Sequence, residues 1–147
     1  MKNKILLITL FICVCIFTLG TMSVSAGTYN GLVYSYKGGN IIITKCGSIT
    51  KADIPAYING KPVTEIGDKA FYNCATLKSV TIPNTVTSIG TAAFSGCSSL
   101  RSVIIENGVT SIGNLAFSRC TSLTDISIPN SVKLIDVSAF ENCSRKI

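Results

Sequence analysis

The residues best suited to chemistry in this chain are four cysteines at a constant spacing of 23 residues, Cys74, Cys97, Cys120 and Cys143. Regularly spaced thiols suggest a metal site or disulfide bonds. Ligands on successive turns of a repeat form a line, however, and a line cannot converge on a tetrahedral metal ion. Side chains repeated in register also point the same way, which opposes the torsion of a disulfide bond. The spacing therefore predicts a column of buried, mostly reduced thiols, with Cys46 outside it as a thiol that is either free or paired.

Other reactive groups are scarce. The chain has no histidine, which is the commonest general base, the usual partner of a nucleophilic Ser or Cys, and a favoured zinc ligand. Its 7 acidic residues form no visible pair with a shared function. The absence of Trp and an aromatic content of 7% leave little to stack on bases. The sequence predicts a protein that is not an enzyme, uses no metal or cofactor and binds no nucleic acid.

The cysteines belong to a repeat of 23 residues that defines the fold. Three successive units begin with LKSVTIP at Leu77, LRSVIIE at Leu100 and LTDISIP at Leu123, and an earlier unit contains five additional residues. The L-x-x-L-x-L spacing is typical of a short strand whose apolar side chains face one side. One unit cannot offset the ordering of its own backbone, so neighbouring units must stack and pair their strands in parallel. The pattern predicts a repeat solenoid of about four rungs, 49–76, 77–99, 100–122 and 123–145.

Two further columns predict the turns of each rung. Gly67, Gly90 and Gly113 occupy one column, where a positive φ is expected, and Asp136 takes this place in the last rung. The sequence A-F-x-x-C then follows in every rung. It predicts a short helical or 3₁₀ turn that points its Phe and Cys side chains into the core.

The segment before the repeat predicts a signal peptide followed by a cap. Residues 1–26 carry Lys2 and Lys4 before an apolar stretch, and the small residues that end at Ala26 predict cleavage after that position. No membrane span is expected once the signal is removed. Two apolar runs, 31–36 and 41–44, flank the turn residues KGGN and predict a β-hairpin. The expected order is a signal peptide at 1–26, an N-terminal β-hairpin cap at 27–48 and the solenoid at 49–147.

The repeated motifs closely resemble those of the BspA-like leucine-rich repeats, whose units run L-x-x-I-x-I-P, V-T-x-I-G and A-F-x-x-C. The resemblance covers Ile49 to Arg145 and departs from the pattern at Glu106 in place of Pro, at Asp136 in place of Gly, and at Lys146, where another rung would begin. It implies a leucine-rich repeat solenoid, secreted or on the extracellular surface, since related proteins have been linked to adhesion. The implied function is a non-catalytic protein-binding or adhesion module whose partner is an extracellular or cell-surface protein. The alternative is a structural repeat fragment of a longer surface protein with no independent binding activity.

The outward positions of the predicted strands form the candidate partner-binding face, because repeat solenoids commonly bind through such a face. Its candidate residues are Lys78, Ser79, Thr81, Arg101, Ser102, Ile104, Asp125 and Ser127. Arg101 beside Ile104 is the strongest local candidate, since Arg is frequent in binding hot spots. The insertion that contains Tyr57 is the second.

The last rung predicts a further contact surface. Lys146 stands where the next rung would begin with an apolar residue. Exposed apolar area and an unpaired strand edge favour association. The sequence therefore predicts a weak homodimer through the last rung, including Ile126, Ile128, Ile135 and Phe140.

Overall fold

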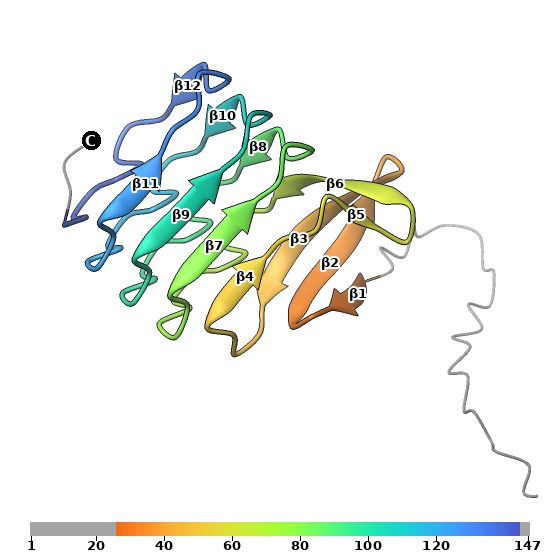
Figure 1. Ribbon diagram of the computed structural model, residues 1–147, viewed down its shortest axis with the longest axis horizontal. Coiled ribbons are helices and arrows are strands. Elements are labelled where there is room, and N and C mark those ends of the chain that lie inside the picture. Colours follow the sequence, from red (N-terminus) through yellow and green to blue (C-terminus); the bar gives the residue numbers. More distant parts are fainter. Residues whose placement is uncertain (1–25, 145–147) are drawn as a thin grey trace, which may run out of the picture.

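The computed structural model describes residues 26–144, which contain twelve β-strands and no helix (Figure 1). The strands are β1 (Ala26–Tyr29), β2 (Leu32–Lys37), β3 (Asn40–Cys46), β4 (Lys51–Asp53), β5 (Tyr57–Ile58), β6 (Lys61–Ile66), β7 (Ser79–Ile82), β8 (Ser88–Ile89), β9 (Ser102–Ile105), β10 (Ser111–Ile112), β11 (Asp125–Ser127) and β12 (Leu134–Ile135). Within residues 26–144 no helix has the length and apolar character needed to cross a membrane. The predicted signal peptide, apart from Ala26, lies outside the described residues.

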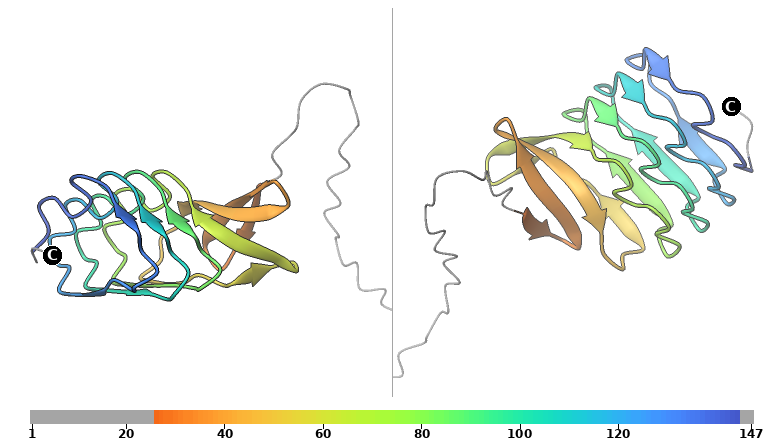
Figure 2. Two further views of the ribbon diagram at one scale, coloured as in Figure 1. Left: turned by 90° about the horizontal axis from the view of Figure 1, so that it is seen from above. Right: turned by 180° about the vertical axis from the view of Figure 1, so that it is seen from behind.

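The strands form two sheets that run along the solenoid (Figure 1). One sheet has the order β4-β7-β9-β11 and is parallel, with Val80 beside Ala52 on one side and Val103 on the other. The other contains β6, β8, β10 and β12 as a second parallel row, with Ile89 beside Ile66. Each rung contributes one strand to each sheet, which confirms the predicted repeat solenoid. Figure 2 shows the same stacking from above and from behind.

Equivalent side chains of successive rungs stack into columns in the core. Phe71, Phe94 and Phe117 are fully buried, and the centroids of successive rings are 4.6 and 5.0 Å apart. Phe140 continues the stack at 5.3 Å and is partly buried. A repeat that places the same residue type in register at every rung produces such columns. The predicted inward orientation of the Phe and Cys side chains is confirmed.

The A-F-x-x-C segments are not the helical or 3₁₀ turns expected from the sequence. At the first of them, Lys69 just before the segment and Asn73 within it have φ values of 58° and 57°, in a left-handed region that a right-handed helix does not contain. Alternate N–H groups also bond outside the segment. That of Phe71 donates to the Ala93 carbonyl of the next rung at 2.7 Å, whereas the N–H groups of the residues on either side of it close local turns. Because half of the donors bond between rungs, no continuous helix forms.

Gly67, Gly90 and Gly113 do share a column, but the positive φ expected for them is wrong, and Asp136 lacks it as well. The left-handed residues lie two and six positions further along each rung. What requires glycine is the close approach of neighbouring rungs. A Cβ on Gly90 would lie 2.7 Å from the backbone nitrogen of Asp68 and 2.9 Å from the carbonyl carbon of Gly67. These contacts are too short for any side chain to fit without a backbone shift.

The N-terminal end is covered by the predicted hairpin of β2 and β3, which pair antiparallel. β1 adds a third antiparallel strand beside β2 that the sequence did not predict. β3 also pairs in parallel with β6, with Ile41 beside Val63, so the hairpin continues the second sheet. The inserted residues form a smaller hairpin of β5 and β6, whose turn at Asn59 and Gly60 has positive φ.

The last described rung is less buried than the rungs before it. Ile135 is 43% exposed, and Ile126, Ile128 and Phe140 are partly buried. Ile112, which pairs with Ile135 one rung earlier, is fully buried. The homodimer through this rung stays a prediction.

Candidate binding face

Six of the eight residues predicted to form the partner-binding face lie in β7, β9 and β11 of the β4-β7-β9-β11 sheet, and Lys78 and Arg101 immediately precede β7 and β9. Three rows cross the strands: Lys78 and Arg101; Ser79, Ser102 and Asp125; Thr81, Ile104 and Ser127. Neighbouring strands are about 4.8 Å apart, so the side chains of one row form a continuous surface. The second and third rows follow from the alternation of inward and outward side chains along each strand, repeated every 23 residues, whereas Lys78 and Arg101 precede the strands.

Ile104 is the apolar centre of this face. It is 54% exposed, although Val103 and Ile105 beside it in β9 are buried. Its partners in the flanking strands are Thr81 and Ser127, both polar. An apolar side chain left in water forgoes about 1.5–3 kcal/mol relative to full burial. A partner that covers Ile104 would recover part of this free energy.

The face also carries two cations without a carboxylate partner. Within residues 26–144 the ion pairs are Lys37–Glu65 at 3.3 Å and Lys51–Asp53 at 2.8 Å. Lys78 and Arg101 belong to neither pair, and both are exposed. The carboxylate of Asp125 accepts a hydrogen bond from the Ser102 hydroxyl at 3.3 Å. The face therefore carries two such cations at the starts of β7 and β9, three positions before the row that contains Ile104.

The insertion, the second candidate from the sequence, lies apart from this face. Tyr57 is 60% exposed on β5, which pairs with β6. In the same hairpin, the ammonium group of Lys61 lies 5.9 Å from the ring centroid of Tyr36, and the Asn59 side chain donates to the Tyr34 hydroxyl at 3.3 Å. The strand pairings do not bring Tyr57 onto the sheet that carries Ile104.

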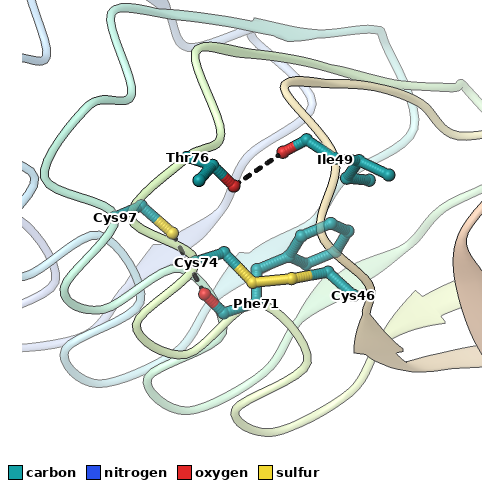
Figure 3. The surroundings of a disulfide bond; sticks show 6 residues. All are labelled: Cys46, Ile49, Phe71, Cys74, Thr76 and Cys97. Carbon is teal, nitrogen blue, oxygen red and sulfur yellow. Dashed lines mark hydrogen bonds between the residues drawn. A yellow bond between two sulfur atoms is a disulfide. The ribbon is translucent and has the colours of Figure 1, made fainter.

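Cys46 and Cys74 form a disulfide bond that joins the hairpin cap to the first rung (Figure 3). This bond answers whether Cys46 is free or paired. It also corrects the prediction that Cys74 belongs to a column of reduced thiols. The free cysteines of the described chain are Cys97, Cys120 and Cys143.

The position of Cys46 explains the disulfide. Its N–H donates to the Ala70 carbonyl at 2.7 Å. This bond is equivalent to the one that the N–H of Phe71 makes to Ala93, the corresponding alanine of the next rung. Cys46 therefore stands where the other turns have phenylalanine. In later rungs each thiol faces the phenylalanine of the preceding turn, and the sulfur of Cys97 lies 3.0 Å from the Phe71 carbonyl oxygen (Figure 3). The side chain of Cys74 points toward the preceding turn in the same way. Since Cys46 stands there in place of phenylalanine, the two sulfur atoms meet.

The free thiols are held in an unreactive form. Burial raises the pKa of the Cys97 thiol to about 12, and burial also raises the pKa of Cys120 and of Cys143. A buried site disfavours the charged thiolate, which is the nucleophile and the metal ligand. No group of three or more Cys, Asp or Glu side chains in residues 26–144 is placed to hold a metal ion.

The stacked rungs and their recurring columns agree with a known repeat family. The BspA-type leucine-rich repeat region matches residues 39–147 in six copies. The chain belongs to the BspA-type leucine-rich repeat family. The match begins before Ile49, where the sequence placed the first rung, and β3 in this earlier segment does pair in parallel with β6. No curated protein matches this BspA-type chain.

Solved structures of bacterial leucine-rich repeat proteins share the fold. A leucine-rich cell surface protein from Faecalibacterium prausnitzii A2-165 is 39% identical with a TM-score of 0.72, over 80% of this chain and 34% of its own. A leucine-rich repeat protein from Bacteroides capillosus ATCC 29799 is 33% identical with a TM-score of 0.71, over 81% of this chain and 96% of its own. One from Bacteroides ovatus ATCC 8483 is 29% identical with a TM-score of 0.73, over 80% and 33%. This BspA-type chain thus spans about a third of two of these proteins and nearly all of the other.

Proposed function

We propose that this BspA-type protein is a non-catalytic protein-binding or adhesion module that acts outside the cell, either secreted or at the cell surface. The observation that carries the proposal is the exposed Ile104 on β9, on a sheet whose strands β7 and β9 are preceded by Lys78 and Arg101, two cations without a carboxylate partner in the described chain. Binding hot spots are enriched in Arg and lie where a partner excludes water. The description of the F. prausnitzii relative as a cell surface protein supports the location.

The partner that fits this face is an extracellular or cell-surface protein that presents a carboxylate next to an apolar side chain. Its carboxylate would accept two parallel hydrogen bonds from the Arg101 guanidinium, and its apolar side chain would cover Ile104. The small polar side chains of Ser79 and Thr81 allow a partner to approach the sheet closely. Complementary charge also speeds the encounter of the two proteins.

Capture of proteins from an extract of cell-surface and extracellular material tests the proposal. The immobilised protein is compared with the double variant Arg101→Asp, Ile104→Asp. We expect the variant to lose the captured partner while its circular dichroism is unchanged, because both side chains are exposed. The matched control is Lys133→Asp, Val137→Asp, which reverses one exposed cation and replaces one exposed apolar residue elsewhere. Undiminished capture by the first variant would contradict the assignment and favour the insertion around Tyr57.

A structural repeat segment without binding activity of its own is the second candidate. The difference in length favours this candidate, because the chain spans 34% of the F. prausnitzii protein. In that case the immobilised wild-type protein retains no more material than a blank surface does. The two functions therefore differ before any variant is made.

We further propose that residues 1–26 direct secretion and are then removed, so that the extracellular product begins at Gly27. N-terminal sequencing of protein recovered from the medium or the cell surface measures this directly. An extracellular product that retains Met1 would contradict the proposed cleavage.

A further inference from the structure

An open hollow of about 650 Å³ lies where the chain leaves β9 and β11, and it shares Ser127 with the binding face. Its polar lining residues are Asn84, Glu106, Asn107, Ser127 and Asn130, and isoleucine and proline side chains complete it. A volume of this order lies within the usual range for small-molecule sites, about 300–1,000 Å³. The hollow is thus large enough to receive one or two sugar rings.

Glu106 is the residue that distinguishes this hollow from the other turns. It occupies the column in which the neighbouring rungs have Pro83 and Pro129. Its carboxylate accepts a hydrogen bond from the backbone N–H of Asn84 at 2.9 Å, and its own N–H donates to the Ile82 carbonyl at 3.0 Å. One inter-rung contact therefore holds the carboxylate of Glu106 at the middle rung of the hollow, and a second holds its backbone there.

The following rung leaves a backbone acceptor in the hollow. The N–H of Glu106 donates to the carbonyl of Ile82 in the rung before it. Pro129 occupies the equivalent position one rung later, because Ser127 lies beside Ile104 in the β9–β11 register. The nitrogen of Pro129 therefore faces the carbonyl of Ile105. Proline has no N–H to donate. The carbonyl of Ile105, which lines the hollow, therefore receives no hydrogen bond from the residue at the Pro129 position.

Three asparagines repeat across the hollow. Asn84, Asn107 and Asn130 occupy the same position in successive rungs, and all three are exposed. Each amide offers two donors and one acceptor oxygen. Rungs are about 4.8 Å apart, so these groups recur along the solenoid at nearly constant intervals. The row of asparagines is visible in the sequence, since an asparagine follows the Pro or Glu position in these three rungs.

The combined surface has mixed donors and acceptors, one carboxylate and apolar patches. A hard cation such as Ca²⁺ prefers six to eight oxygen ligands, usually with several carboxylates, whereas this hollow has a single carboxylate. Sugar hydroxyls both donate and accept, and sugar rings also have apolar faces. We propose that the hollow binds a neutral carbohydrate chain laid across the three asparagines.

The test is an NMR titration of the ¹⁵N-labelled protein with cellotetraose, maltotetraose and chitotetraose in separate experiments. We expect saturable shifts of the backbone amides of Asn84, Glu106 and Asn107 with at least one of these probes. The absence of saturable shifts with all three would overturn the proposal. Calcium chloride alone is the fourth titration, and shifts of the same amides with calcium but with no sugar would assign the hollow to a cation instead.

Variants separate a sugar site from a general surface effect. Asn107→Ala should weaken the binding of the responding sugar by about tenfold or more, because it removes up to two hydrogen bonds. Glu106→Gln should change it by less than about threefold, because a neutral ligand keeps its hydrogen bonds to an amide. Asn40→Ala, an exposed asparagine on the cap, is the matched control and should bind like the wild type. Equal affinities for Asn107→Ala and Asn40→Ala would contradict the proposed site.

Discussion

The backbone N–H of Cys46 donates to the carbonyl of Ala70 at 2.7 Å, so the hairpin cap is bonded to the first turn in the way that each turn is bonded to the next. The disulfide between Cys46 and Cys74 reinforces the same junction. The cap is therefore held by one covalent bond in addition to the pairing of β3 with β6.

Removal of the disulfide should destabilise the whole solenoid. The bond joins residues 28 positions apart, and a loop of this length is expected to stabilise the folded chain by about 3.5 kcal/mol. We expect Cys46→Ser, Cys74→Ser to lower the free energy of unfolding by about this amount in urea titrations. Wild-type protein measured in reductant is the control and should lose the same stability. A double variant as stable as the oxidised wild type would contradict the bond.

The cysteines should fall into two classes on labelling. The folded protein should react slowly at Cys97, Cys120 and Cys143, because burial raises the pKa of each thiol. Denatured without reductant, these three should label, and with reductant Cys46 and Cys74 should label as well. Peptide mass spectrometry assigns the modified positions. Labelling of Cys74 without reductant would show that the cap is not covalently joined.

Alkaline pH should destabilise the protein through the buried thiols. A thiol in the unfolded chain titrates near pH 8.5, whereas burial raises the pKa of Cys97 to about 12. Between these values the unfolded chain releases a proton that the folded chain retains, so the free energy of unfolding falls as pH rises. The slope is about 1.4 kcal/mol per pH unit for each buried thiol. Urea unfolding from about pH 8 to about pH 10.5 should show a shallower fall for Cys97→Val than for the wild type, and equal slopes would contradict this origin.

Alanine at the glycine column should disrupt the spacing between rungs. We expect Gly90→Ala to lower the free energy of unfolding by about 3 kcal/mol, because its Cβ would lie 2.7 Å from the backbone nitrogen of Asp68. The control is Gly38→Ala, where φ is 58° but no atom lies within 4 Å of the new Cβ. There we expect only the conformational cost of about 1 kcal/mol. A larger loss at Gly38 than at Gly90 would show that conformation, and not contact, is limiting.

The rungs were predictable from sequence because their inward positions carry one residue type throughout. Columns such as Phe71 and Phe94 give the period, the stacking and the core directly. The conformation of the turns was not predictable in this way. The left-handed column contains Lys69, Ala92 and Leu115, residues that share no conformational preference. Hydrogen bonds to the next rung impose the turn, and a single unit does not show them.

The grouping of the candidate face followed from the outward positions of the L-x-x-L-x-L spacing, but whether its charged side chains form ion pairs did not. Whether Lys78 and Arg101 meet a carboxylate depends on where the side chains of four strands lie. The disulfide was hidden for a similar reason. The turn that holds Cys46 is shorter than the later turns and the following rung contains an insertion, so its column is revealed by the hydrogen bond from its N–H to the Ala70 carbonyl and not by the sequence spacing.

The bonds from the phenylalanine turns to the following rung determine how the amide hydrogens of these phenylalanines exchange with solvent. The N–H of Phe71 donates to Ala93, and that of Phe94 donates to Ala116. An amide exchanges when its own hydrogen bond opens. Protection of the Phe71 amide therefore reports whether the next rung is folded, and fraying of a rung appears as fast exchange in the turn before it. The exchange of these phenylalanine amides is therefore displaced by one repeat from local unfolding, whereas amides such as that of Gly90, which donates to Ile66, report on the rung before them.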